Sequence, residues 1–127
     1  MSTWRRKAIE YFPDLKKEFE VPDATIYSVF MELLPAAITA HKGNNKHLLE
    51  NIYNYAEWCS TQKEQELWDA AGVVFYEHLV DYKESLEALP KWVKPNIYKQ
   101  IRGLLELRLD EKQLRKLDDH YKQLKSK

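Results

Sequence analysis

The sequence predicts an all-α protein, an irregular bundle of about six helices in a single domain. Apolar residues recur at helical spacing along most of the chain, and no stretch alternates apolar and polar residues for long enough to form a strand. Three glycines and five prolines interrupt the 127 residues at few places. Hydrophobic residues make up 44% of the chain, which is enough for one core, so residues 1–127 are expected to form one domain.

Prolines mark the element boundaries in the first part of the chain. Residues 2–12 form a first predicted helix, and Pro13 begins a second helical piece, because its fixed φ and missing amide hydrogen suit a first turn. A longer helix is predicted to follow Pro22 and to end at Gly43 in the left-handed conformation. Pro35 lies about half a turn from the apolar face of that helix, so it should kink the helix without interrupting the core.

The middle of the chain carries two further predicted helices. Asn44 or Asn45 begins a helix that runs to Ser60. Thr61 and Glu64 have the spacing of a capping box, which predicts that the next helix begins there. The predicted buried residues of this next helix share one face: Leu67, Ala70, Ala71, Val74, Phe75, His78 and Tyr82.

Two helices are predicted in the last part of the chain. Residues 85–89 are expected to form a turn before Pro90, and Pro95 begins the next helix. The pair Asp110–Gln113 has capping-box spacing and predicts a final helix over residues 111–126. Because this helix has few apolar residues, it is expected either to pack by one edge or to protrude from the bundle.

Composition argues against several protein classes. The longest apolar stretch, residues 33–40, contains a proline and is shorter than the roughly 20 residues that span a membrane. No apolar segment follows the basic N-terminus, so no secretory signal peptide is predicted. Cys59 is the only cysteine and can form neither an internal disulfide nor a cysteine-rich metal site. These features predict a cytoplasmic protein without a membrane-spanning segment.

Charge is balanced overall but unevenly distributed. The 20 basic and 20 acidic residues give a formal net charge of zero. Residues 14–89 contain 6 Lys and 14 acidic residues, a net charge of −8, whereas residues 90–127 contain 11 basic and 5 acidic residues, a net charge of +6. This asymmetry favours a partner with uneven charge, unless oppositely charged elements pack together and neutralise each other.

No motif in the chain predicts an enzyme. Neither an HExxH nor a Glu-x-x-His spacing is present, and the glycines are too scattered for a phosphate-binding loop. His78 lies within the apolar face of its predicted helix, where Tyr82 could be its hydrogen-bond partner, so the two form a candidate buried polar site. A satisfied core histidine is favoured over a ligand or catalytic role. No catalytic residue, metal or cofactor is therefore predicted.

The helix over residues 45–60 carries the candidate binding surface. One edge, away from the centre of the apolar face, carries residues at spacings of four, three and four: His47, Asn51, Asn54 and Trp58. Glu50 and Glu57 lie beside this edge on the solvent side. A large aromatic residue among polar ones is typical of an interface anchor with a polar rim. The alternative is that a neighbouring helix covers Trp58.

Two stretches of the chain resemble a known family. They are Trp4-Arg5-Arg6-Lys7-Ala8 with Tyr11-Phe12-Pro13-Asp14-Leu15, and Ile52-Tyr53-Asn54-Tyr55-Ala56-Glu57-Trp58-Cys59 followed by Val73-Val74-Phe75-Tyr76-Glu77-His78-Leu79. Over residues 4–110 the chain is similar to an uncharacterised family of small bacterial all-helical domains, some of which are associated with immunity to polymorphic toxins. The resemblance implies an all-helical fold and an immunity role, and it implies no active-site residue.

We therefore expect a non-enzymatic protein-binding domain, most concretely an immunity-type protein that occludes the active surface of a toxin. A basic toxin domain, such as a nuclease, would complement the acidic middle of the chain. The alternatives are a regulatory helical adaptor, a nucleic-acid-binding protein that uses the basic C-terminal helix, and an enzyme centred on His78. Nucleic-acid binding is disfavoured because Glu111, Asp118 and Asp119 interrupt the basic residues of that helix.

Overall fold

A computed structural model describes residues 2–125 of the chain, with side chains up to residue 123. The segments in which apolar residues recur at helical spacing are helices in this structure. Its elements, in chain order, are α1 (Thr3–Tyr11), a 3-10 turn (Pro13–Leu15), α2 (Lys16–Glu20), α3 (Ile26–Lys42), α4 (Lys46–Ser60), α5 (Gln65–Ala70), a π segment (Ala71–Tyr76), α6 (Glu77–Leu79), α7 (Lys83–Trp92), α8 (Pro95–Leu105) and α9 (Glu111–Lys125). The predicted all-α class is confirmed. The described residues form eight continuous helices rather than about six.

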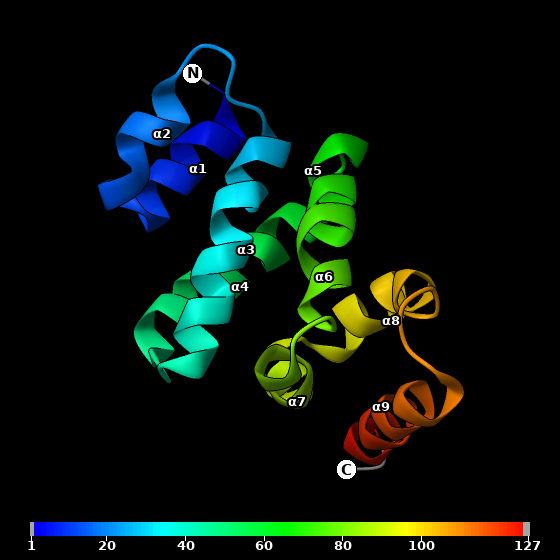
Figure 1. Cartoon of the computed structure of the whole chain (residues 1–127). Coiled ribbons are helices and arrows are strands. Elements are labelled where there is room, and N and C mark those ends of the chain that lie inside the picture. The colour runs from blue at the N-terminus through cyan, green and yellow to red at the C-terminus, as the bar shows by residue number, and fades with distance from the viewer. Residues whose placement is uncertain (1, 126–127) are drawn as a thin grey trace.

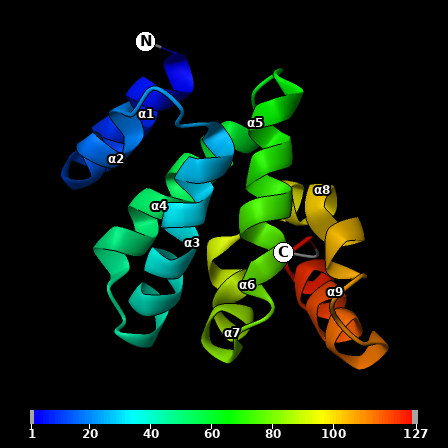
Figure 2. The ribbon, with the colours of Figure 1, turned by 45° about the horizontal axis from the view of Figure 1, so that its top comes forward.

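The helix α3 lies at the centre of the bundle. It packs against α4, the π segment and α7, while α1 packs on α4. The pair α1–α2 lies on one side of the molecule and α8–α9 on the other, with the two ends of the chain on opposite sides (Figure 1). A second view shows α3 beside α4, and α8 and α9 beyond the rod that α5, the π segment and α6 form together (Figure 2).

Aromatic rings from α3, α4 and the π segment, with that of Phe12 directly after α1, form the centre of the core. Phe30 on α3 contacts Tyr55 and Phe75, with ring centroids 5.6 and 5.8 Å apart. Phe12 meets Tyr55 edge to face at 6.1 Å. The buried hydroxyl of Tyr55 donates a hydrogen bond of 2.9 Å to the backbone oxygen of Trp4, so its polar group is satisfied and α1 is attached to α4.

The rod formed by α5, the π segment and α6 contains a change of helical register. A π turn holds one more residue than an α turn, which rotates the following side chains by about 100°. Leu79 therefore takes the fully buried position predicted for His78, whose side chain keeps 32% of its surface exposed. Tyr82 lies beyond the end of α6 and is 42% exposed. The prediction that His78 and Tyr82 are buried is therefore wrong.

The end of α3 differs from its predicted geometry. Gly43 has a φ of −90°, and the left-handed residue is Asn44, with a φ of 54°. Asparagine tolerates this conformation because its short polar side chain can bond locally. The predicted cap of the next helix is confirmed, since the side chain of Asn45 accepts a bond of 3.2 Å from the amide of Leu48. Pro35 lies inside α3 with its side chain exposed, so the core is not interrupted.

Thr61 ends α4 rather than beginning α5. Its hydroxyl donates a hydrogen bond of 3.0 Å to the carbonyl of Trp58, and its amide also bonds back to α4. The first residue of α5 is Gln65, preceded by Glu64, whose side chain makes no capping bond. The capping box predicted for Thr61 and Glu64 is therefore wrong, because the hydroxyl is already used by the preceding helix.

In the C-terminal part of the chain, α7 is longer than predicted, and α9 begins where it was predicted to begin. The predicted turn before Pro90 is the ten-residue helix α7, which continues through the proline. The predicted capping box at Asp110 and Gln113 is confirmed, with both reciprocal bonds present at 2.7 and 3.2 Å. Leu117 and Tyr121 of α9 are buried. Residues 126 and 127 of the predicted helix and basic tail lie outside the described residues.

Candidate functional site

The predicted binding surface runs along α4, and the structure places its members in two groups by exposure. His47, Glu50 and Asn54 are exposed, and Asn51, Glu57 and Trp58 are half-buried. Glu57 forms an ion pair with Lys94, which precedes α8, with 2.8 Å between Oε1 and Nζ. One of the two carboxylates of this surface is thus already paired by another part of the chain.

Trp58 is partly covered by its neighbours. Its ring stacks on that of Tyr55, with centroids 6.1 Å apart and an angle of 24° between the ring planes. The Nζ atom of Lys7 on α1 lies 5.7 Å from the centroid of the Trp58 ring, a cation–π distance. The alternative that a neighbouring helix covers Trp58 therefore holds in part, because Lys7 of α1 lies over the indole while Trp58 is only half-buried. The role of Trp58 as an interface anchor stays a prediction.

The open portion of Trp58 lines a hollow of about 410 Å³ between the starts of α1 and α5 and the end of α4. We call it the Trp58 hollow, and its lining residues are Ser2, Thr3, Trp4, Trp58, Gln62, Glu64, Glu66 and Leu67. Trp4 supplies a second half-buried indole, and Glu64 and Glu66 supply two exposed carboxylates. Sequence reasoning missed this grouping, because residues 2–4 meet residues 58–67 there, and these two segments are far apart in the chain.

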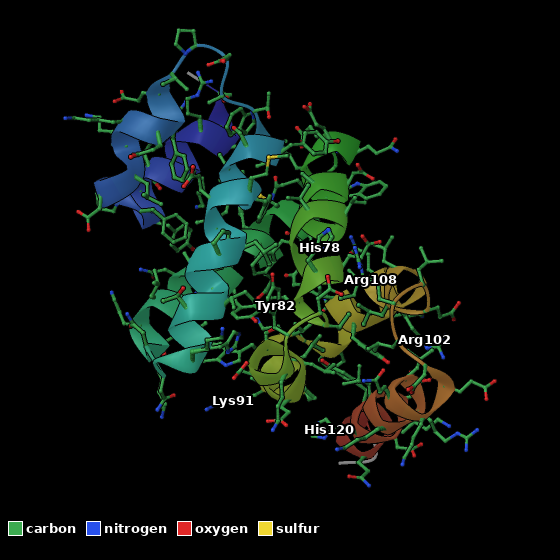
Figure 3. The ribbon with its side chains drawn as sticks, viewed as in Figure 1. His78, Tyr82, Lys91, Arg102, Arg108 and His120 are labelled. Atoms are coloured by element: carbon green, nitrogen blue, oxygen red, sulfur yellow. The ribbon has the colours of Figure 1, made fainter. Side chains whose placement is uncertain are left out.

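His78 belongs to a charged surface cluster. Arg108, which follows α8, reaches back to α6 and the residues after it (Figure 3). Its Nη1 lies 3.2 Å from Oδ1 of Asp81, its Nε lies 3.5 Å from Oε2 of Glu77, and its Nη2 lies 3.0 Å from Nδ1 of His78. Nothing in the sequence places Arg108 here, and its guanidinium pairs with the carboxylates of Glu77 and Asp81 on either side of His78.

Nδ1 of His78 has two alternative partners. It can accept a hydrogen bond from Arg108 while its proton is on Nε2, or donate one to Asp81, whose Oδ2 lies 3.1 Å away. Either tautomer of the ring therefore finds a partner for Nδ1 within the cluster. The arrangement therefore ties the segment after α8 to α6 as a structural contact.

A second histidine has a buried partner. Nε2 of His41 lies 2.7 Å from the hydroxyl of Tyr53, and the ring of Tyr53 stacks on that of Trp92 at 5.4 Å. Burial lowers the pKa of His41 below its ordinary value, although the charge of Glu84 acts in the opposite direction. Burial likewise raises the pKa of Tyr53. The polar contact joins α3 to α4, and the ring stack joins α4 to α7.

The described residues lack two specialised features. Within residues 2–125, no three side chains of His, Cys, Asp or Glu are grouped so that they could hold a metal ion. No helix in the same part of the chain is long and apolar enough to cross a membrane. Cys59 is buried, and this burial raises the pKa of its thiol to about 12.

Comparisons with known proteins bear on the family and not on the function. The chain matches no curated protein and no solved structure. A family match covers residues 5–108, close to the extent of the sequence resemblance, and it ends before α9. Nothing in that match connects the family with toxin immunity. The chain belongs to the family described as a domain of unknown function, DUF7674.

Proposed function

We propose that this protein is a non-enzymatic protein-binding domain that docks a basic partner at the Trp58 hollow and along the adjoining edge of α4. The observation that carries the proposal is the grouping of two half-buried indoles with two exposed carboxylates in one hollow. Tryptophan is enriched among the residues that dominate binding energy at interfaces, and a hollow lets a partner side chain be desolvated. Exposed carboxylates around such an anchor select a partner by charge.

The chemistry of the hollow indicates how a partner would bind. Lys7 lies over the ring of Trp58, and the guanidinium of Arg5 lies 5.1 Å from the centroid of the Trp4 ring. These cations occupy ring faces, so a partner's lysine or arginine would pair with Glu64 and Glu66. The indole edges would then contact the aliphatic part of that side chain.

The most concrete form of this proposal is an immunity-type protein acting in the cytoplasm, whose partner is a toxin domain with a basic active surface. Glu50 on α4 extends the acidic character of the hollow along the helix, since its side chain is exposed. Binding there would cover the partner's basic cleft and exclude its substrate. A regulatory adaptor would use the same surface without inhibiting its partner.

Charge reversal at the hollow tests the proposal. The double variant Glu64→Lys/Glu66→Lys is compared with Glu18→Lys/Glu20→Lys, which reverses two exposed carboxylates on α2. Glu66 and Glu18 both lie in the first turn of a short helix, so the two variants carry similar local costs. Tagged proteins are used to capture partners from the host lysate at low and high salt, and the captured proteins are quantified.

The proposal expects one protein that binds the wild type and the α2 variant in stoichiometric amounts but is lost from the hollow variant. High salt should weaken this capture, since exposed charges are screened. Equal capture by all three proteins, or no specific capture by the wild type, would overturn the proposal. If the captured protein is a nuclease, stoichiometric inhibition by the wild type distinguishes an immunity protein from an adaptor.

A further inference from the structure

A groove of about 780 Å³ lies between α7 and α9, on elements that take no part in the Trp58 hollow. Its apolar lining comes from three places in the chain: Val80 after α6, Leu86 and Pro90 on α7, and Leu117 on α9. Val80 and Leu117 are buried, and the other two are half-buried. The half-buried pair therefore offers apolar surface that a ligand could still cover.

Basic side chains surround this apolar lining. The lysines Lys83 and Lys91 come from α7, and Lys116 comes from α9 together with the imidazole of His120. In Figure 3, Lys91 lies on α7 and His120 on the neighbouring edge of α9. None of the ion pairs found within residues 2–125 involves any of these three lysines. The Nζ atom of Lys91 lies 5.7 Å from the centroid of the Trp92 ring, a cation–π distance. Lys83 and Lys116 are therefore the lysines whose charges are most available to a ligand.

The groove contains two carboxylates, and one of them is already paired. Asp81 lies 3.2 Å from Arg108 and 3.1 Å from His78. Glu87 is exposed on α7 and lines the groove together with the three lysines. The groove therefore has an excess of positive charge over an apolar floor, a pattern that complements a molecule with an anionic group and an apolar body.

We propose that the groove between α7 and α9 binds a small organic anion with an apolar body, of the class of a medium-chain carboxylate. Its volume lies within the range of roughly 300–1,000 Å³ that is typical of small-ligand sites. The carboxylate of the ligand would pair with lysines from both helices, and the alkyl chain of the ligand would cover Leu86 and Pro90. A nucleic acid would use the lysines but would leave this apolar surface uncovered.

Titration with decanoate, below its micelle concentration, tests the proposal on the full chain. Amide shifts in the ¹H–¹⁵N spectrum identify where the probe binds, and the uncharged analogue decanamide measures the contribution of the carboxylate. The variant Lys83→Glu/Lys116→Glu reverses one cation on each helix. Lys16→Glu/Lys17→Glu is the matched control, because both of its lysines are exposed on α2. Circular dichroism and thermal melting establish that each variant is folded.

Binding should shift amides of residues 80–91 and 113–120, and decanamide should bind more weakly than decanoate. The groove variant should lose affinity by on the order of tenfold or more, because both reversed charges repel the carboxylate, while the control keeps the wild-type affinity. Shifts elsewhere, equal binding of decanamide, or equal affinity in both variants would overturn the proposal. So would a short oligonucleotide that shifts these amides while decanoate does not.

Discussion

Asp118 accepts two hydrogen bonds from Arg102 and thereby joins α9 to α8. Its Oδ2 lies 2.7 Å from Nη2 of Arg102, and its Oδ1 lies 2.9 Å from Nε. The hydroxyl of Tyr98 donates a third bond of 2.6 Å to the same carboxylate. The Arg102 guanidinium, together with the Tyr98 hydroxyl, holds the pKa of Asp118 below its ordinary value. A helix with few apolar residues is thus attached through polar contacts.

Acidification should weaken this attachment. A carboxyl whose pKa is lowered on folding stabilises the fold above its unfolded pKa, about 3.9, and loses that contribution as the pH falls through its folded pKa. Asp118→Asn should lower the free energy of unfolding at pH 7 by about 1 kcal/mol, since the pair is partly exposed. Urea denaturation at several pH values should show this difference shrinking below about pH 4. Asp119→Asn, on the exposed side of α9, is the control and should change little.

Tyr121 supplies the second attachment of α9. Its ring stacks on Tyr98 with centroids 4.0 Å apart, and its hydroxyl donates a buried bond of 2.6 Å to the carbonyl of Val93. Tyr121→Phe keeps the stack and leaves that carbonyl without its partner, so the free energy of unfolding should fall by about 1–2 kcal/mol. Tyr82→Phe, at an exposed residue, should cost almost nothing in the same denaturation experiment. Equal effects of the two substitutions would show that the Tyr121 bond does not stabilise the fold.

His41 should make the protein less stable as the pH falls below about 6.5, the ordinary pKa of histidine. Its pKa is lowered in the folded state because burial disfavours the charged ring. The unfolded chain therefore binds more protons over that interval, and the free energy of unfolding rises with pH. An NMR titration should give a pKa below the ordinary value, and His41→Gln should flatten the stability profile between pH 7 and 5. His47→Gln, at an exposed residue of α4, controls for loss of an imidazole.

Gly103→Ala should stabilise the protein. Gly103 lies inside α8, and a Cβ atom there would meet nothing within 4 Å. Alanine is favoured over glycine inside a helix by about 0.5–1 kcal/mol, mostly because glycine has more conformational freedom in the unfolded chain and loses it on folding. At Gly72 the added Cβ would lie 3.1 Å from Cδ1 of Leu104, so Gly72→Ala should gain less. Chemical denaturation of both variants measures the change in the free energy of unfolding. If Gly103→Ala destabilised the protein, position 103 would not be an open position inside α8.

Cys59 should be unreactive in the native protein. Its side chain has no exposed surface, and burial raises the pKa of its thiol to about 12. Because the thiolate is the reactive form, modification by a disulfide reagent should require opening of the fold. The rate should increase on the order of a hundredfold or more when urea unfolds the chain. Rapid modification in native buffer would show that the end of α4 opens readily.

Short-range signals in the sequence were sufficient for the class of the fold and for several boundaries. Asn45 and the pair Asp110–Gln113 act on amides within their own helices, so their roles can be read from spacing alone. Pro95 begins α8 for the same local reason. Thr61 shows the limit of such reasoning. Its hydroxyl could cap the start of α5 or bond to the end of α4, and it donates its bond to the carbonyl of Trp58 in α4.

The candidate sites depended on contacts between distant segments. The six predicted residues of α4 share one helix, but only the approach of α1 and α5 turns the surroundings of Trp58 into a hollow. The groove likewise needs α7 and α9 side by side. The spacing of residues along the sequence predicts neither the hollow nor the groove, because such spacing shows which residues share a face of one helix and not which helices pack together.

The sequence by itself determined that this chain is helical, where most of its helices begin, and that its charge is divided between two parts. The tertiary structure alone decided which side chains are exposed after the π segment, where Leu79 replaces His78 in the core. It also decided that Arg108 returns to Glu77 and Asp81. The physical reason is that helix caps and periodicity act within a few residues, whereas register shifts and ion pairs between helices depend on packing of the whole bundle.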